Sequence, residues 1–210
     1  MNSREFVKAR WGFDPQSDSR VIRQLTSDMS EAQMFTKVRN TKYIERLAGR
    51  NVLRSYNVSE HSFFVSYLFK TMADKEGIEV TSDDMLLVLL HDFTEVITGD
   101  LVNLAKSLNE KTKEAWGIIE HELAEHHTAF RPFTEERIKE SLGPQKAALL
   151  RDCDLLELWS FIVEDIFEFG NRSPNITSVK EDLEPIIWGS QFQSVKKFLT
   201  EYQTALEEDR

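Results

Sequence analysis

The stretch of sequence that decides the fold is LLVLLHDFTEVITGDL, residues Leu86–Leu101. Its apolar first part predicts a buried helix, which we expect to extend over Met85–Ile97. Its second part carries polar side chains that can act as acids, bases or metal ligands. A carboxylate or imidazole buried without a partner is costly, and a bound metal ion removes that cost. The polar side chains of this part are His91, Asp92, Glu95 and Asp100.

The spacing of these residues indicates a single site. On a helix, Asp92 and Glu95 are three residues apart and His91 and Glu95 are four apart, so both pairs share a face. His91 and Asp92 point about 100° apart, and they can share one ion where the helix meets another element. Gly99 can end the helix with a positive φ, which lets Asp100 face back into the same cleft. The alternative is a helix end with ordinary capping carboxylates, and the combined offsets favour the site.

Composition limits the classes of function. The chain has 210 residues, of which 40% are hydrophobic and 30% are charged, as expected for one globular domain. The formal net charge of -10 disfavours broad binding of nucleic acid. No apolar run approaches the ~20 residues of a membrane span, and the first residues lack the apolar core of a signal peptide. Cys153 is the only cysteine, so we expect no disulfide within the chain. Together, these features of the composition predict a cytoplasmic protein without nucleic-acid or membrane partners.

Apolar residues recur at helical spacing along the chain, whereas runs of alternating β-branched residues are few. The sequence therefore predicts an all-α fold. Ser59 is the expected N-cap of the helix that carries His61. We predict helices over residues 21–38, 43–48, 59–72, 85–97, 110–130, 146–169 and 186–206.

Two further polar residues lie beside apolar helical positions. A single histidine such as His61 is more often a capping or core residue, but the second histidine at the end of the next long apolar helix favours a ligand. Asp154 follows one pair of leucines and precedes another, so we expect it to be partly buried and to need a partner. Asp152 is interpreted as a surface residue.

These residues form a set of two imidazoles and two carboxylates, called here the metal-ligand set. Such a mixture suits a divalent Mn, Fe, Co, Ni or Zn ion better than Ca. Four protein ligands leave positions on a six-coordinate ion for water and substrate. An ion of this kind lowers the pKa of bound water and polarises a phosphoryl oxygen. The metal-ligand set comprises His61, His91, Asp92 and Asp154.

The order of these residues resembles that of the HD-domain metal-dependent phosphohydrolases. A closer match is with the bacterial 5'-deoxynucleotidases of the YfbR type. The segments that carry it are Arg50–Val52, NVSEHS at Asn57–Ser62, and HDFTEVITGDL at His91–Leu101. The resemblance covers about Arg46 to Phe169.

The resemblance implies a single HD-domain helical bundle, which we place at residues 39–210. Residues 1–38 are expected to form a helical extension packed on this domain. We find no family counterpart for this extension or for the tail after Ile176. Relatives of this type are often homodimers, so we expect a homodimer, with the aromatic-rich first and last segments as its interface.

The resemblance also implies roles for the site residues. The metal-ligand set would hold one divalent ion, Glu95 would orient or activate the attacking water, and Asp100 would assist near the scissile phosphate. Arg46 matches the phosphate-binding arginine of the family, and the metal and Arg46 together would neutralise the phosphate. Lys106 can add a second positive charge. For Arg46 and Lys106, solvated surface positions are the alternative interpretation.

Two positions depart from the family pattern. Leu47 stands where the family has a tryptophan implicated in sugar discrimination. The stretch Val102–Ala105 lacks the proline that the family usually has there. Both positions lie where the sugar and phosphates should bind, so the departures concern the choice of substrate and leave the hydrolytic centre intact.

The resemblance implies hydrolysis of (deoxy)nucleoside 5'-monophosphates to nucleoside and phosphate. One alternative is a dNTP triphosphohydrolase that releases nucleoside and triphosphate, with Lys106, Lys111 and Lys113 as candidate phosphate ligands. A second is a non-catalytic nucleotide sensor, which a missing ligand or a missing Glu95 would favour; the sequence has all of them. A structural adaptor is a third alternative, and it would need neither Asp92 nor Glu95.

Overall fold

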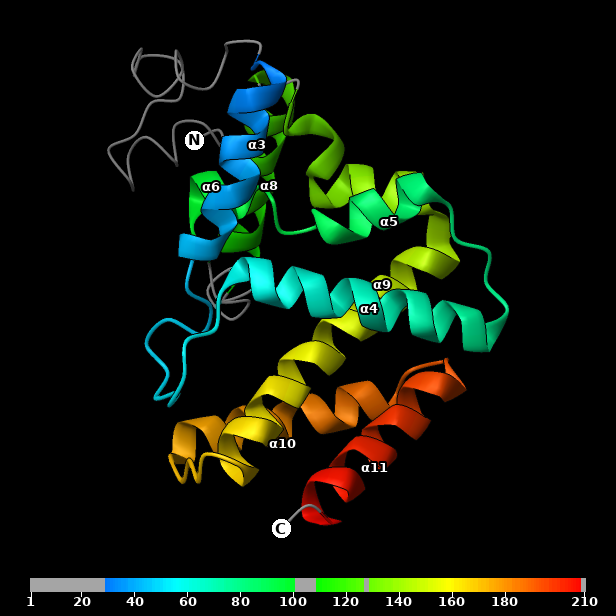
Figure 1. Ribbon diagram of the computed structural model, residues 1–210. Helices are drawn as coiled ribbons and strands as arrows, with labels where there is room; N and C mark the ends of the chain where they lie inside the picture. Colours follow the sequence, from blue (N-terminus) through cyan, green and yellow to red (C-terminus); the bar gives the residue numbers. More distant parts are fainter. Residues whose placement is uncertain (1–28, 101–108, 127–128, 209–210) are drawn as a thin grey trace.

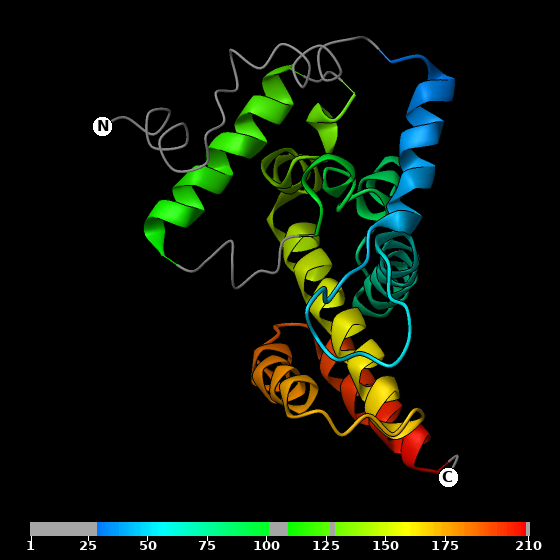
Figure 2. The same ribbon diagram turned by 90° about the vertical axis from the view of Figure 1, so that its left-hand side faces the viewer.

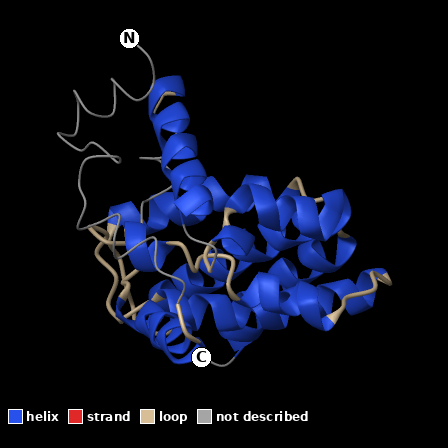
Figure 3. Ribbon diagram, turned by 90° about the horizontal axis from the view of Figure 1, so that it is seen from above, coloured by secondary structure: helices blue, strands red, loops and turns tan. Residues whose placement is uncertain are grey.

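The computed structural model describes residues 29–100, 109–126 and 129–208, and this part of the chain consists of helices and loops (Figures 1 and 3). Its β-structure is one isolated antiparallel bridge between Glu45 and Asn57. The prediction of an all-α fold is confirmed. The described helices are α3 (Glu31–Asn40), η1 (Thr41–Tyr43), α4 (Val58–Glu76), α5 (Ser82–Leu89), α6 (Glu95–Thr98), α8 (Glu110–His126), η2 (Arg131–Phe133), α9 (Glu135–Phe167), α10 (Pro174–Trp188) and α11 (Gln193–Glu208).

Helix α9 organises the bundle. It packs against α4, α5, α10 and α11, and it links the upper group of helices to α10 and α11 at the lower end (Figures 1 and 2). Gly143, with φ 71° and ψ 170°, and Pro144 interrupt the helical backbone near its start. The main hydrophobic core lies around α9, and its fully buried side chains include Phe69, Met72, Leu149, Leu156 and Trp159.

A second, smaller hydrophobic cluster lies beside α3 and α6. It consists of the buried residues Leu90, Phe93, Phe130 and Phe133. The rings of Phe93 and Phe130 stack with centroids 4.5 Å apart, and Phe133 meets Phe93 edge-on at 5.5 Å. Because Leu90 and Phe93 flank the His91-Asp92 dipeptide in the sequence, this cluster holds the backbone on both sides of it.

The predicted continuous helix over Met85–Ile97 is wrong. Helix α5 ends at Leu89, and its C-cap Leu90 has the non-helical angles φ -111° and ψ 21°. Four turn residues follow before α6 begins at Glu95. The apolar run is also less buried than predicted, since Leu86 is 51% exposed.

The predicted helix over residues 43–48 is also wrong. Only the short η1 forms there, and Ile44 is extended, with φ -98° and ψ 102°. The chain instead pairs with the segment before α4: Arg46 N donates to Tyr56 O at 2.7 Å, and Val58 N donates to Ile44 O at 3.0 Å. This long-range pairing satisfies backbone groups that a local helix would otherwise satisfy.

Other helix boundaries also differ from the prediction; for example, α9 begins at Glu135 and not at residue 146. Asn57, rather than Ser59, is the N-cap of α4, because its side chain accepts from Glu60 N at 3.0 Å. The predicted last helix over 186–206 is in fact the end of α10 and most of α11, with a break from Gly189 to Phe192. No described helix has the length and apolar character needed to cross a membrane.

The division of the chain at residues 38 and 39 stays a prediction, because residues 1–28 lie outside the described part. Helix α3 runs across this boundary without a break. Its partly buried Met34 and Val38 pack against the second hydrophobic cluster.

Candidate metal centre and active site

The His91-Asp92 dipeptide lies in the turn between α5 and α6. The turn is held by backbone hydrogen bonds from His91 N to Val88 O and from Phe93 N to Leu90 O, at 3.3 and 3.0 Å. His91 Nδ1 lies 2.8 Å from the Val88 carbonyl oxygen. Because a carbonyl only accepts, His91 carries its proton on Nδ1 and keeps Nε2 available as a ligand.

Three separate segments bring the predicted metal ligands together. His61 comes from the first turn of α4 and is fully buried, and Asp154 comes from α9. His61 Nε2 lies 3.0 Å from Asp154 Oδ1 and 3.5 Å from Asp92 Oδ2, and His91 Nε2 also lies 3.5 Å from Asp92 Oδ2. The ligand atoms of His61, His91 and Asp154 are all within 4.8 Å of one another.

The geometry of this cluster fits a divalent metal ion. The Nε2 atoms of His61 and His91 are buried and have no hydrogen-bond partner of suitable geometry, and such atoms need a ligand. Two donor atoms that bind one ion at about 2.1 Å and at right angles lie about 3 Å apart. The distances of 3.0 and 3.5 Å within the metal-ligand set agree with this value.

The other ring nitrogen of His61 is hydrogen-bonded to Glu157, a residue that was not predicted to belong to the site. Glu157 is 5% exposed, and its Oε2 atom contacts both His61 Nδ1 and the hydroxyl of Tyr56. Its position three residues after Asp154 on α9 places it on the same helix face, and this spacing was the available signal. Burial and Arg46 lower the pKa of His61, but Glu157 and Asp154 outweigh them and raise it to about 9.

Arg46 lies at the edge of the metal-ligand set. Its guanidinium forms an ion pair with Asp92, lies 3.9 Å from Asp154 Oδ1, and is 5.7 Å from the centroid of the Tyr56 ring. Burial alone would lower the pKa of Arg46, but Asp92 and other acidic neighbours, including Glu95, raise it well above its usual value. Arg46 is therefore a permanent cation at the site.

The remaining predicted site residues have different environments. Glu95 is buried at the first position of α6. Leu47 is half-buried against the main core and has φ 55°, an uncommon value for a residue with a side chain. Asp100 is half-buried and follows Gly99, and no hydrogen bond or ion pair joins it to the described residues of the metal-ligand set. Lys106 lies outside the described residues.

The two aspartates of α9 differ from each other. Asp154 is partly buried, as predicted, with 31% of its side chain exposed. The prediction that Asp152 is a surface residue is wrong, because it is 8% exposed and accepts a hydrogen bond from Ser190 Oγ. Ser190 belongs to the connection between α10 and α11, so a segment remote in sequence buries Asp152.

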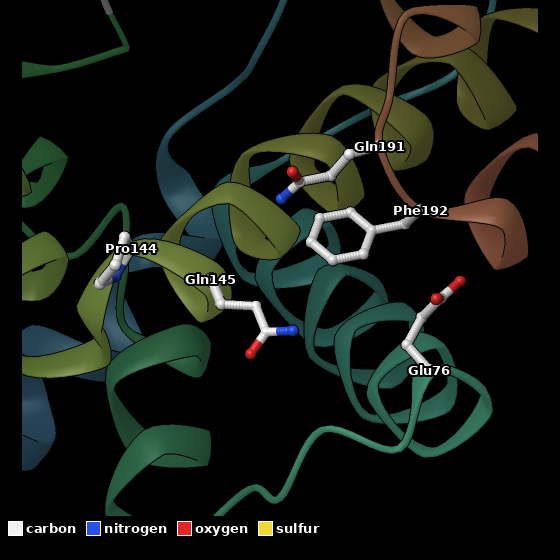
Figure 4. Close-up of a pocket in the computed structure, with 5 residues that line it drawn as sticks. All are labelled: Glu76, Pro144, Gln145, Gln191 and Phe192. Atoms are coloured by element: carbon white, nitrogen blue, oxygen red, sulfur yellow. The ribbon is translucent and has the colours of Figure 1, made fainter.

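A shallow cavity of about 610 Å³ lies away from the metal-ligand set. It is found where the C-terminal end of α4, the start of the long part of α9 and the α10–α11 connection meet (Figure 4). None of its lining residues was predicted as a site residue. They are Glu76, Pro144, Gln145, Gln191 and Phe192.

Two solved structures with this fold are of HD-domain phosphohydrolases. The cyanophage S-2L enzyme DatZ, solved with dA and one catalytic Zn²⁺ ion, is 15% identical, with a TM-score of 0.64 over 87% of this chain and 99% of DatZ. A phosphohydrolase from Listeria innocua is 22% identical, with a TM-score of 0.67 over 85% of this chain and 90% of its own. The fold is thus that of the HD-domain phosphohydrolases.

A model of the family described as 5'-deoxynucleotidase YfbR-like matches residues 33–206. The chain belongs to this family of hydrolases. It is 26% identical over 152 residues to a 5'-deoxynucleotidase of Vibrio cholerae, covering 66% of this chain and 77% of that protein. It is also 26% identical over 158 residues to 5'-deoxynucleotidase YfbR of Salmonella typhi, covering 69% and 78%. The match begins inside the expected extension and continues beyond Ile176, so the expectation of no family counterpart is wrong for residues 33–38 and for the tail.

Proposed function

We propose that this protein hydrolyses deoxynucleoside 5'-monophosphates to nucleoside and phosphate at the metal-ligand set. The observation that carries the proposal is the pair of buried Nε2 atoms of His61 and His91, which face two carboxylates beside the permanent cation Arg46. The 5'-deoxynucleotidases among its relatives support this choice of substrate.

Each residue of the site has a separate role in the proposed reaction. A divalent ion held by the metal-ligand set would polarise a phosphoryl oxygen and make a water molecule more acidic. Arg46 would bind and orient the phosphate with its planar guanidinium. Glu95 would accept the proton of the attacking water as general base. The oxygen of that water bonds to phosphorus, and the bond from phosphorus to the 5'-oxygen breaks. The 5'-oxygen takes up a proton and Glu95 releases the one that it accepted, so the carboxylate is regenerated. Asp100 would assist near the scissile phosphate.

We further propose that the ion is one of Mn, Fe, Co, Ni and Zn, since a set of imidazoles and carboxylates suits these metals. The zinc ion in DatZ supports this range. Cytoplasmic location is part of the proposal, and it agrees with the single cysteine, Cys153, which is a buried free thiol.

We also propose a homodimer. Phe63 and Tyr67 are four residues apart on α4 and are 61% and 63% exposed, and Leu86 on α5 is 51% exposed. Because α4 and α5 pack against each other, an isologous contact through these helices, in place of the first and last segments expected from the sequence, would cover these side chains. A monomeric mass by light scattering would contradict this proposal.

The test of the proposed activity uses protein stripped of metal and then supplied with Mn²⁺ or Co²⁺. Deoxy- and ribonucleoside mono- and triphosphates are incubated side by side and the products identified, with Asp92→Asn as the control. We expect phosphate from deoxynucleoside monophosphates and a large loss of product with the variant. Release of triphosphate from a dNTP would establish the triphosphohydrolase alternative, and no product despite bound metal would favour a nucleotide sensor.

A further inference from the structure

A buried hydrogen-bond network lies behind His61, on the side away from the other metal ligands. The Oε2 atom of Glu157 accepts from His61 Nδ1 and from the hydroxyl of Tyr56, and the hydroxyl oxygen lies 3.0 Å from the same nitrogen. The exposed fractions of His61, Tyr56 and Glu157 are 0%, 1% and 5%. The reaction proposed above gives no role to Tyr56 or Glu157.

The acceptor in this network determines the tautomer of His61. An ionised carboxylate only accepts hydrogen bonds, so a His61 Nδ1 atom in contact with it must carry a proton. In the neutral imidazole, Nε2 then has a lone pair, and Nε2 is the atom that lies 3.0 Å from Asp154 Oδ1 and 3.5 Å from Asp92 Oδ2. A carboxylate on the remote nitrogen also increases the basicity of the ligand nitrogen.

The position of Tyr56 is itself restrained. Its ring stacks on Phe161 with centroids 3.9 Å apart and an interplanar angle of 18°. Its backbone carbonyl accepts from Arg46 N at 2.7 Å. The hydrogen bond from the Tyr56 hydroxyl therefore restrains the position of the Glu157 carboxylate. Glu157 also lies on the same face of α9 as the predicted ligand Asp154.

We propose that Glu157 and Tyr56 are positioning residues that hold His61 in the tautomer and orientation that bind the divalent ion, and that they thereby set the metal affinity of the site. The inference rests on the metal site of the proposed function but not on the identity of the nucleotide. His91 offers an internal contrast, because its Nδ1 contacts a neutral backbone carbonyl. A carboxylate is thus hydrogen-bonded to the Nδ1 atom of His61, whereas the Nδ1 atom of His91 has a backbone carbonyl as its partner.

The chain contains a matched control for this network. Glu164 lies seven residues after Glu157 on α9, and it accepts from the hydroxyl of Tyr202 and pairs with Arg54. As in the network of Glu157, a tyrosine hydroxyl is bonded to a glutamate of α9. No member of the metal-ligand set takes part in this second pair. Glu164→Gln and Tyr202→Phe therefore make the same chemical changes as Glu157→Gln and Tyr56→Phe.

The test measures Zn²⁺ affinity by competition with a chromophoric chelator, using the full chain and the four variants. We expect Glu157→Gln to weaken binding by about tenfold to a hundredfold and Tyr56→Phe to weaken it by a smaller factor. The control variants should bind with the affinity of the unchanged protein. Activity of Glu157→Gln should recover as the metal concentration rises, which general structural damage would not allow.

Unchanged affinity in Glu157→Gln, or an equal loss in Glu164→Gln, would overturn the inference. If Glu157→Gln does not fold, Tyr56→Phe decides, and unchanged affinity in that variant overturns the inference as well. His91→Ala separates this failure from a failure of the proposed function. If the unchanged protein binds Zn²⁺ and His91→Ala does not, the metal site stands even when the positioning role fails, whereas no binding by the unchanged protein removes both.

Discussion

At the scale of the residue, Arg46 is the cation on which phosphate binding depends in the proposed reaction. It is placed by a backbone pairing with Tyr56 and not by a helix, and its side chain is only 12% exposed. The neighbouring Leu47 has a positive φ, which is unfavourable for a residue with a side chain. The backbone pairing at Arg46 therefore outweighs the intrinsic conformational preference of Leu47.

Replacing Arg46 by lysine should lower kcat/KM for a deoxynucleoside monophosphate by about thirtyfold, because a lysine cannot make the two parallel hydrogen bonds of a guanidinium, worth about 2 kcal/mol. Steady-state kinetics at saturating metal measures the change. Zn²⁺ affinity should not fall, since Arg46 is not a ligand. Unchanged kcat/KM would contradict a role in phosphate binding.

Replacing Glu95 by glutamine should lower kcat by about a hundredfold to ten-thousandfold, because the amide cannot accept the proton of the attacking water. Metal affinity should be preserved, because Glu95 is not one of the metal-ligand set. Single-turnover kinetics with bound metal checks this result. A fall in metal affinity without a fall in kcat at saturating metal would instead make Glu95 a ligand.

At the scale of the element, the end of α5 determines where two of the predicted metal ligands lie, because His91 and Asp92 are in the turn that follows it. Helix α5 begins at a capping box in which Thr81 Oγ1 accepts from Asp84 N at 3.1 Å and Asp84 Oδ2 accepts from Thr81 N at 2.8 Å. Asp84 also pairs with Lys146 of α9 at 2.6 Å. These contacts anchor the start of α5, and the second hydrophobic cluster anchors the turn that follows its end.

Burial raises the pKa of Asp84, but hydrogen bonds from Lys146 and Thr81 outweigh it and lower the pKa below its ordinary value. The stabilisation is therefore present above the unfolded pKa of about 3.9 and is lost as the pH falls through the folded pKa. Asp84→Asn should reduce the free energy of unfolding by about 1–2 kcal/mol at pH 7, and the difference should shrink below about pH 4.

Urea unfolding at a series of pH values measures this difference. Asp83→Asn is the matched control, because Asp83 is the exposed neighbour of Asp84 in the same turn. A difference for Asp84→Asn that does not depend on pH would show that the ionised pair with Lys146 is not its source.

At the scale of the whole molecule, the metal-ligand set joins α4, the turn after α5, and α9. These segments are remote in sequence, and the hydrophobic clusters hold them in contact. A metal ion that binds all three in the folded state has no comparable site in the unfolded chain, so binding and folding are coupled.

Adding Mn²⁺ at a hundred times its dissociation constant should raise the free energy of unfolding by about 2.7 kcal/mol. Thermal unfolding with and without the ion measures the shift, and a chelator should reverse it. His91→Ala should show a much smaller shift at the same concentration. An equal shift in that variant would locate the bound ion elsewhere.

The sequence by itself determined the all-α class and indicated the residues of the metal-ligand set, because helical periodicity and motif order are local properties. Only the tertiary structure decided where α5 ends, because the turn at His91 depends on Phe130 and Phe133 packing against Phe93. The burial of Asp152 and the network of Tyr56 with Glu157 also depend on segments that are far apart in the sequence. Such contacts follow from long-range packing, which the spacing of residues along one helix does not specify.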